Sequence, residues 1–186
     1  MNSARQNVVV IQADQLAAPF LRSYGGKAKT PHLDSLAASG TVFKNFYCNY
    51  PLCGPSRGSM MTGKIASRDG VNDNASELPA SEPTVAQFLR HNGYQTCLSG
   101  KMHFVGPDQL HGFQERVTTD IYPSDFGWTP DWLAEGHQLP PSGMSMRAVV
   151  EAGISERSLQ IDYDEEACHQ AEVKLWEYAR AAEQKP

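Results

Sequence analysis

The residues best suited to chemistry in this sequence surround a cysteine, Cys53, which is followed by Gly54-Pro55-Ser56-Arg57. Pro55 suits the first turn of a helix, so Cys53 is expected at a helix N-terminus with Arg57 on the first turn. Free N–H groups, the helix dipole and a guanidinium that binds two oxygens at once all favour an anion there. The alternative for a single cysteine is that it only fills the core. The pattern predicts an oxyanion-binding turn centred on Cys53.

A second pair of reactive side chains, Lys101 and His103, lies within one short stretch of sequence. The pair follows residues 94–98, which we expect to form a strand. Ligands gather at the carboxyl ends of strands in open α/β sheets, so both side chains are expected where a ligand would bind. A solvated lysine and a structural histidine are the alternatives.

Asp14 and Gln15 end a run of mainly β-branched residues, 7–13, with the pattern of a parallel strand covered on both faces. A carboxylate at the end of such a strand is suited to catalysis or to metal binding. Gln15 adds an amide oxygen beside it. The alternative for Asp14 is an ordinary helix or turn cap.

The elements that must position these residues alternate along the chain. Strands are expected over residues 7–13, 41–47 and 94–98, and helices over 30–40, 83–92 and 162–182. The expected packing residues of the three helices are Leu33, Leu36 and Ala37, then Val85, Phe88 and Leu89, then Ala167, Ala171, Leu175 and Tyr178. Residues 104–132 read as a structured loop with aromatic side chains near a pocket, and 136–158 have no clear period. This order predicts an α/β fold.

The motif C-x-P-S-R, with Thr62-Gly63 after it, resembles the signature of the sulfatase family, with Met61 where leucine is usual. The upstream string from Thr30 to Phe43 and the later G-K-x-H also resemble that family. The resemblance implies the N-terminal part of an alkaline-phosphatase-like sulfatase fold, with a mostly parallel sheet flanked by helices. It also implies that another protein, a formylglycine-generating enzyme, converts Cys53 to formylglycine, whose hydrate is the nucleophile.

The same resemblance implies roles for the other candidate residues. Arg57 would hold the nucleophile and its metal-linked network, Lys101 a sulfate oxygen, and His103 the second hydroxyl. A divalent cation would be held by Asp14, Gln15 and the modified Cys53, although Gln15 replaces an acidic residue of the family pattern. Calcium suits such oxygen ligands best, and magnesium and manganese remain open.

Two strings, G-K-M-H-F-V-G-P-D-Q-L-H-G-F and T-T-D-I-Y-P-x-D-F-G-W-T-P-D-W, resemble the choline sulfatase branch of the family. The substrate implied is choline sulfate, whose trimethylammonium group would bind over the ring of Trp128, with Asn74 as a polar contact. Ordinary packing is the alternative for Trp128. A phosphonate monoester or phosphodiester hydrolase, which shares C-x-P-x-R, is the nearest other function.

The chain of 186 residues is expected to be one incomplete domain, 1–186, the N-terminal portion of a sulfatase catalytic domain without its C-terminal part. Residues 1–186 alone are therefore expected not to hydrolyse sulfate esters. The alternative is that this chain is a fragment without any catalytic function. The full-length enzyme is expected to be a homo-oligomer.

Composition excludes several other classes of protein. A net charge of −5 without a basic stripe argues against nucleic-acid binding. The apolar run at 8–11 is too short for a signal segment or a membrane span, so a cytoplasmic location without membrane association is expected. The four cysteines, Cys48, Cys53, Cys97 and Cys168, lack zinc or redox spacing and are expected to be reduced thiols.

Overall fold

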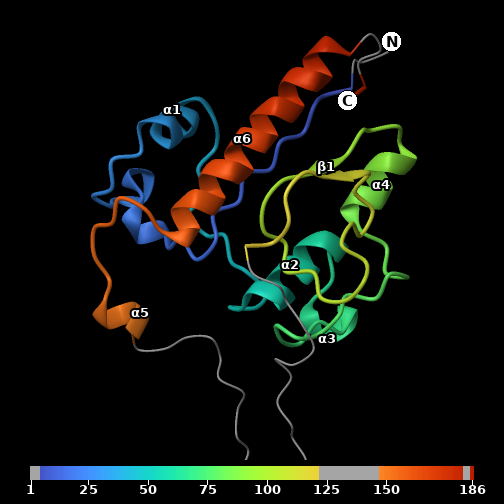
Figure 1. Cartoon of the computed structure of the whole chain (residues 1–186), viewed down its shortest axis with the longest axis horizontal. Helices are drawn as coiled ribbons and strands as arrows, with labels where there is room; N and C mark the ends of the chain where they lie inside the picture. The colour runs from blue at the N-terminus through green and yellow to red at the C-terminus, as the bar shows by residue number, and fades with distance from the viewer. Residues whose placement is uncertain (1–4, 122–146, 182–184) are drawn as a thin grey trace, which may run out of the picture. The chain divides into compact units, whose positions relative to one another are not determined.

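The structure, a computed structural model, describes residues 5–121, 147–181 and 185–186 (Figure 1). The chain divides into two compact units, and each is described by itself. The smaller unit is Asn7–Cys48, and the larger unit comprises Met1–Gln6 and Asn49–Pro186. Trp128 lies outside the described residues.

The smaller unit contains two short 3₁₀ helices, η1 (Ala18–Phe20) and η2 (Arg22–Tyr24), and the helix α1 (Pro31–Ser39). Pro31 opens α1 directly after Thr30, which confirms the start that the sequence predicts. The hydroxyl of Tyr24 donates to the carbonyl of Phe43 at 2.8 Å, which holds η2 to the chain after α1. The expected packing residues Leu33 and Leu36 are exposed.

The strands predicted over 7–13 and 41–47 are wrong, because neither segment has regular secondary structure. The side chains of Val8 to Ile11 are 61–82% exposed. A strand satisfies its backbone N–H and C=O groups only through a neighbouring strand. The described residues of the smaller unit contain no strand. The β-branched residues of 7–13 therefore have no neighbouring strand there with which to pair, and their β propensity alone does not form one.

The larger unit begins with α2 (Cys53–Thr62), α3 (Ala66–Asp69) and α4 (Val85–His91). α2 starts at the cysteine, as predicted, and ends at Gly63, whose φ of 69° allows its N–H to reach the carbonyl of Ser59. α2 packs against both α3 and α4. The core beside it is formed by Met61, Val71, Leu78, Ala86, Leu98, Met102 and Phe104.

α4 confirms the helix predicted over 83–92. The side chain of Thr84 accepts the N–H of Gln87, and the Gln87 side chain accepts the N–H of Thr84, so the helix has a capping box. The packing differs from the prediction, because Ala86 is its buried residue whereas Val85 and Phe88 are exposed.

Two short parallel strands, β1 (Cys97–Leu98) and β2 (Glu115–Arg116), form the sheet of the larger unit. Cys97 pairs with Glu115 and Leu98 with Arg116. β1 confirms the end of the strand predicted over 94–98, whereas β2 falls in a segment that the sequence predicts as loop. The structure therefore places the chain after Leu98 at the carboxyl end of a parallel strand, as predicted.

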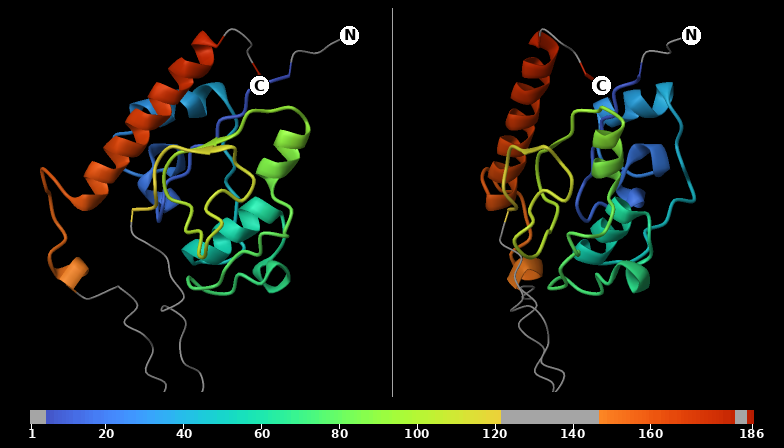
Figure 2. Two further views of the ribbon diagram at one scale, coloured as in Figure 1. Left: turned by 45° about the vertical axis from the view of Figure 1, so that its right-hand side comes forward. Right: turned by 90° about the vertical axis from the view of Figure 1, so that its right-hand side faces the viewer.

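α5 (Arg147–Val150) and α6 (Leu159–Arg180) complete the described elements. α6 begins three residues before the predicted helix 162–182, because the Ser158 side chain caps it by accepting the N–H of Ile161. It runs beside the loops around β1 and β2 (Figure 2), where the Ser99 hydroxyl donates to the carbonyl of Ala167 at 2.7 Å.

The packing face of α6 differs in part from the predicted stripe. Ala167, Ala171 and Tyr178 are half-buried, but Leu175 is 55% exposed. Lys174 lies on the packed side instead and forms ion pairs with Glu115 and Glu177. These bonds raise the pKa of Lys174, first through the hydrogen bond to Glu115. α6 is thus attached to β2 partly by charge.

Candidate active site

The N-terminus of α2 carries Cys53 as its first residue, and its cap comes from a distant part of the chain. Leu52, the residue before the helix, provides no side-chain acceptor. Instead the N–H of Gly54 donates to Oδ1 of Asn74 at 2.8 Å. The segment around Asn74 therefore satisfies one of the free N–H groups at this helix end and fixes the turn that bears the thiol.

Arg57, one turn further along α2, connects the helix to the lysine and histidine motif. Its side chain is buried, with only 4% of the residue surface exposed. One guanidinium nitrogen donates to the carbonyl of Lys101 at 2.6 Å and lies 3.7 Å from the Met102 sulfur. A buried charge is costly unless it is hydrogen-bonded, and these contacts offset part of that cost.

Lys101 points back to the cysteine: its Nζ lies 3.5 Å from Sγ of Cys53. Both residues are half-buried. The thiol at the helix N-terminus and the ammonium from the end of β1 thus share one small region. A positive charge and a helix N-terminus both favour an anion there, as the sequence predicts.

His103 is buried beside the same turn, and its Nε2 lies 2.9 Å from the carbonyl of Asn74. Burial lowers the pKa of His103, and the bond to Asn74 opposes part of that change. The ring is therefore neutral at pH 7. Because a carbonyl only accepts hydrogen bonds, the neutral ring carries its proton on Nε2 and a lone pair on Nδ1.

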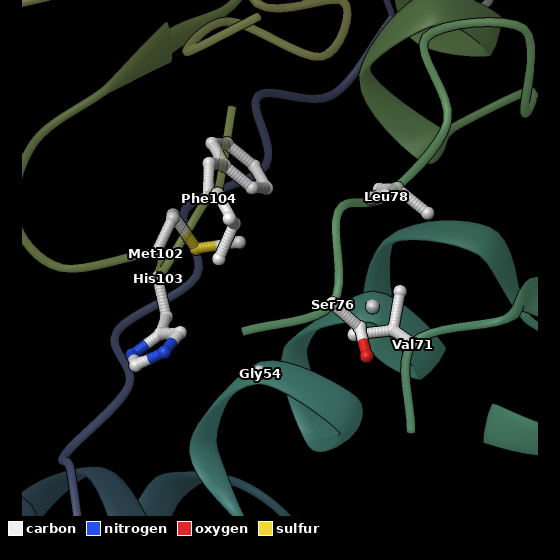
Figure 3. A pocket seen from close by; sticks show the side chains of 9 residues that line it. Gly54, Val71, Ser76, Leu78, Met102, His103 and Phe104 are labelled. Atoms are coloured by element: carbon white, nitrogen blue, oxygen red, sulfur yellow. The ribbon is translucent and has the colours of Figure 1, made fainter. Parts of the chain in front are cut away.

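Behind the turn lies a small cavity, lined in part by Gly54, Gly58 and His103 (Figure 3). Its volume is about 10 Å³, room for no more than a single water molecule. A Cβ on Gly54 would lie 3.0 Å from the carbonyl of Asp73 and 3.2 Å from Oδ1 of Asn74. Glycine at position 54 permits this close approach of α2 to the segment around Asn74.

Asp14 and Gln15 lie in the smaller unit, next to each other in the chain, and Gln15 has a φ of 53°. A carboxylate and an amide oxygen suit a hard cation such as calcium or magnesium. Within the described parts of the chain, no three histidine, cysteine or acidic side chains gather as a metal site. Two oxygens of this kind are fewer than the six to eight that calcium takes.

The structure brings together five of the eight residues that the sequence identifies: Cys53, Arg57, Asn74, Lys101 and His103. Asp120 is not among the eight, yet its Oδ1 accepts the N–H groups of Met102 and His103. No spacing rule relates an aspartate to amides 17 and 18 positions earlier. Its place in the T-T-D string was the only signal.

Two curated proteins similar to this chain are sulfatases by name. A choline-sulfatase of Rhizobium meliloti (strain 1021) is 45% identical over 181 residues, covering 97% of this chain and 35% of that protein. Arylsulfatase A of Homo sapiens is 42% identical over 110 residues, covering 55% of this chain and 22% of its own length. The chain thus spans about a third or less of the length of these relatives.

Solved structures agree with the fold of part of the chain. A protein crystallised with a neocarrahexaose has a TM-score of 0.52 and 32% identity, covering 55% of this chain and 25% of its own. A 2-O glycosaminoglycan sulfatase has a TM-score of 0.50 and 28% identity, covering 56% and 24%. The sulfatase neighbours have the alkaline-phosphatase-like fold, and this chain matches an N-terminal part of it.

No helix among the described residues combines the length and apolar character needed to cross a bilayer.

The sequence pattern that describes the Sulfatase family matches residues 6–153. That family generally uses formylglycine and a divalent metal ion. Because the match covers most of the chain, and both motifs meet at Cys53, the chain belongs to the sulfatase family.

Proposed function

We propose that the protein carrying this chain hydrolyses a sulfate monoester, with Cys53 as the site of the nucleophile. The observation that supports this most is the 3.5 Å approach of the Lys101 ammonium to Sγ of Cys53 at the start of α2. Hydrolysis of such an ester needs a nucleophile beside groups that neutralise the charge on the sulfate oxygens. The cysteine turn and the lysine supply these two parts from different elements.

Each residue of the cluster has a role that follows from its position. Formylglycine, formed from Cys53 by a formylglycine-generating enzyme, would as its hydrate supply the nucleophilic hydroxyl. Attack on sulfur would break the ester S–O bond and release the alcohol, and the second hydroxyl would then expel sulfate as the aldehyde forms again. Lys101 binds a sulfate oxygen, since its ammonium already reaches the side chain of residue 53. Arg57 fixes the Lys101 backbone and holds the nucleophile turn. His103, neutral with a lone pair on Nδ1, is able to take up a proton.

The metal is proposed to be calcium, with magnesium or manganese as alternatives. Asp14 and Gln15 would each provide an oxygen, and the modified residue 53 another. Calcium takes six to eight oxygen ligands, so residues beyond these three must contribute. Residues 1–186 are accordingly proposed to be the N-terminal portion of a catalytic domain. A cytoplasmic homo-oligomer is the proposed form of the whole enzyme.

Choline sulfate is the proposed substrate, because the choline-sulfatase relative matches 97% of this chain. Trp128 would bind the trimethylammonium group over its ring. Asn74, whose side chain is bonded to the cysteine turn, is proposed as a polar contact for the substrate. Its Oδ1 accepts the N–H of Gly54, so its amide nitrogen is the atom left for a substrate contact.

The test uses the full protein, made with and without the formylglycine-generating enzyme. Modification should lower the mass of the peptide containing residue 53 by about 18 Da, the difference between a thiol and an aldehyde side chain. Only modified protein should release sulfate from choline sulfate, and Cys53→Ala should release none. Activity of unmodified protein, or faster turnover of a phosphodiester than of choline sulfate, would contradict the proposal.

A further inference from the structure

The turn that carries Lys101 and His103 has an unfavourable backbone. Gly100, just before it, has a φ of 96°, and His103 has a φ of 57°. Glycine adopts such angles readily, but a residue with a Cβ does so at a cost and needs surrounding contacts to hold it there. The conformation of His103 therefore depends on bonds from outside the turn.

Those bonds come from a short segment just after β2. Oγ1 of Thr118 accepts the N–H of Gly100 at 2.6 Å. Oδ1 of Asp120 accepts two amides at once, the N–H of Met102 at 2.8 Å and that of His103 at 3.1 Å. A carboxylate that binds two neighbouring N–H groups fixes the peptide between them, so Asp120 determines the direction of the His103 backbone.

Asp120 is itself held by an ion pair. Its Oδ2 lies 2.7 Å from a guanidinium nitrogen of Arg116, and the two side chains are only 8% and 9% exposed. Nε of Arg116 donates to the carbonyl of Thr118 at 3.0 Å, and its NH1 to Oε1 of Gln109 at 2.8 Å. These bonds satisfy the buried charges of both Asp120 and Arg116.

α6 supports the same segment from its other side. The Tyr163 hydroxyl donates to the carbonyl of Thr119 at 2.6 Å. Thr118 and Asp120 are thus bonded to the turn that carries Lys101 and His103, and Thr119 between them is bonded to α6. These three consecutive residues connect α6 to that turn.

We propose that Asp120 is a positioning residue. Paired with Arg116, its carboxylate holds His103 in the left-handed conformation and so keeps Lys101 directed at Cys53 and the His103 ring at the carbonyl of Asn74. The effect on turnover rests on the proposed function, whereas the effect on the backbone does not. The Asp120 carboxylate bonds the two amides and Arg116, so Asp120 acts on the lysine and histidine through the backbone.

The chain offers a matched control in Asp108. Its Oδ1 also accepts two consecutive amides, those of Leu110 and His111, each at 2.9 Å. Its Oδ2 lies 3.5 Å from Nδ1 of His111. Asp108→Asn therefore changes the same kind of cap in a neighbouring loop, without a bond to the lysine turn.

The experiment compares Asp120→Ala, Asp120→Asn and Asp108→Asn in the full, modified protein. Turnover of choline sulfate is measured per formylglycine, together with residue-resolved amide hydrogen exchange. Asp120→Ala should lower kcat about 100-fold, the loss typical of a displaced catalytic group, with a much smaller change in KM. The amides of Met102 and His103 should exchange faster while those of α2 keep their rates. Asp108→Asn should retain kcat.

Asp120→Asn keeps an oxygen for the two amides but loses the charge that pairs with Arg116. It should show a smaller loss, about tenfold in kcat. This variant carries the test if Asp120→Ala does not fold. Unchanged kcat and unchanged exchange at Met102 and His103 in Asp120→Asn would overturn the proposal. An equal loss in Asp108→Asn would assign both residues to general stability and overturn it too. If the parent protein does not hydrolyse choline sulfate, the proposed function fails, and the exchange rates alone decide the role of Asp120.

Discussion

Asn74 holds His103 with its main chain: its carbonyl lies 2.9 Å from Nε2 of the histidine. The side chain of the same residue accepts the N–H of Gly54, at the start of the helix that carries Cys53. One residue thus fixes both the nucleophile turn and the proton carried by the imidazole. This dual contact makes the contributions of its side chain and main chain separable by mutation.

Asn74→Ala should destabilise the folded protein by about 1 kcal/mol, the usual cost of losing a helix N-cap acceptor. Asn74→Asp, which keeps the oxygen, should retain that stability. Both variants keep the carbonyl that binds His103. The free energy of unfolding in urea gives the first effect, and the KM for choline sulfate gives the proposed substrate contact. Equal stability of Asn74→Ala and the parent would contradict the cap.

Arg57→Lys should lower turnover by about 100-fold or more, because a flexible lysine ammonium cannot reproduce the planar guanidinium that places NH1 on the Lys101 carbonyl. The control is Arg68→Lys, an exposed arginine on α3, which should retain activity. Turnover is measured per formylglycine, so that incomplete modification does not count as a catalytic defect. An active Arg57→Lys variant would show that only the positive charge is needed.

The stability of the protein should fall as the pH is lowered. His111 is fully buried, and burial lowers the pKa of His111 below its usual 6.5, with Asp108 opposing the change. As the pH falls, position 111 therefore binds a proton at a higher pH in the unfolded chain than in the folded protein. The stabilisation is complete above about pH 6.5 and is lost as the pH falls below it. The pKa of His103 is lowered in the same direction and contributes likewise.

The check is the free energy of unfolding of the parent and of His111→Asn, measured at intervals from about pH 7.5 to pH 5.5. Asparagine tolerates the positive φ of 39° at this position. The variant should be less stable at pH 7.5 and should show a weaker dependence on pH than the parent. Identical slopes would exclude His111 as a source of acid sensitivity.

What the sequence predicted well is local. The starts of α1 at Pro31 and of α2 at Cys53 follow from a proline at or near the first helical position, and the helix over 83–92 follows from its local pattern. The strand over 7–13 failed because strand formation depends on a neighbouring strand. Asp120 was missed for a related reason, since its partners are distant in sequence. Composition alone does not identify such pairs.

The candidate site was predicted in two ways. Cys53 and Arg57 followed from helix physics and the resemblance together, and the structure adds the approach of Lys101 to the thiol. The resemblance also supplied Asn74 as a substrate contact, and the structure adds a second role as the cap of α2. A cap from a residue 20 positions away has no sequence signature.

Trp128→Ala should raise the KM for choline sulfate far more than the KM for a neutral aryl sulfate. A desolvated trimethylammonium group over an indole ring gains about 2 kcal/mol, which corresponds to roughly a thirtyfold change in binding. Trp176→Ala, on the exposed surface of α6, is the matched control and should change neither value. Equal losses on the two substrates would assign Trp128 to packing.

The metal site offers a gain-of-affinity prediction. Gln15 lies beside Asp14 and has a φ of 53°, a conformation that aspartate also tolerates. Gln15→Asp would add a second carboxylate at this position, and greater ligand charge strengthens calcium binding. Calcium affinity of the full protein, measured by calorimetry after chelation, should therefore rise at least about tenfold, or by about 1.4 kcal/mol.

Asn45→Asp is the control for that variant, because it adds the same charge elsewhere in the smaller unit. It should leave calcium affinity unchanged. Chelation should abolish turnover in the parent protein, and added calcium should restore it in the parent at higher concentration than in Gln15→Asp. If the parent, Gln15→Asp and Asn45→Asp all bind calcium with the same affinity, residue 15 does not contribute to the metal site. Asp14 would then be the only metal ligand proposed in the smaller unit.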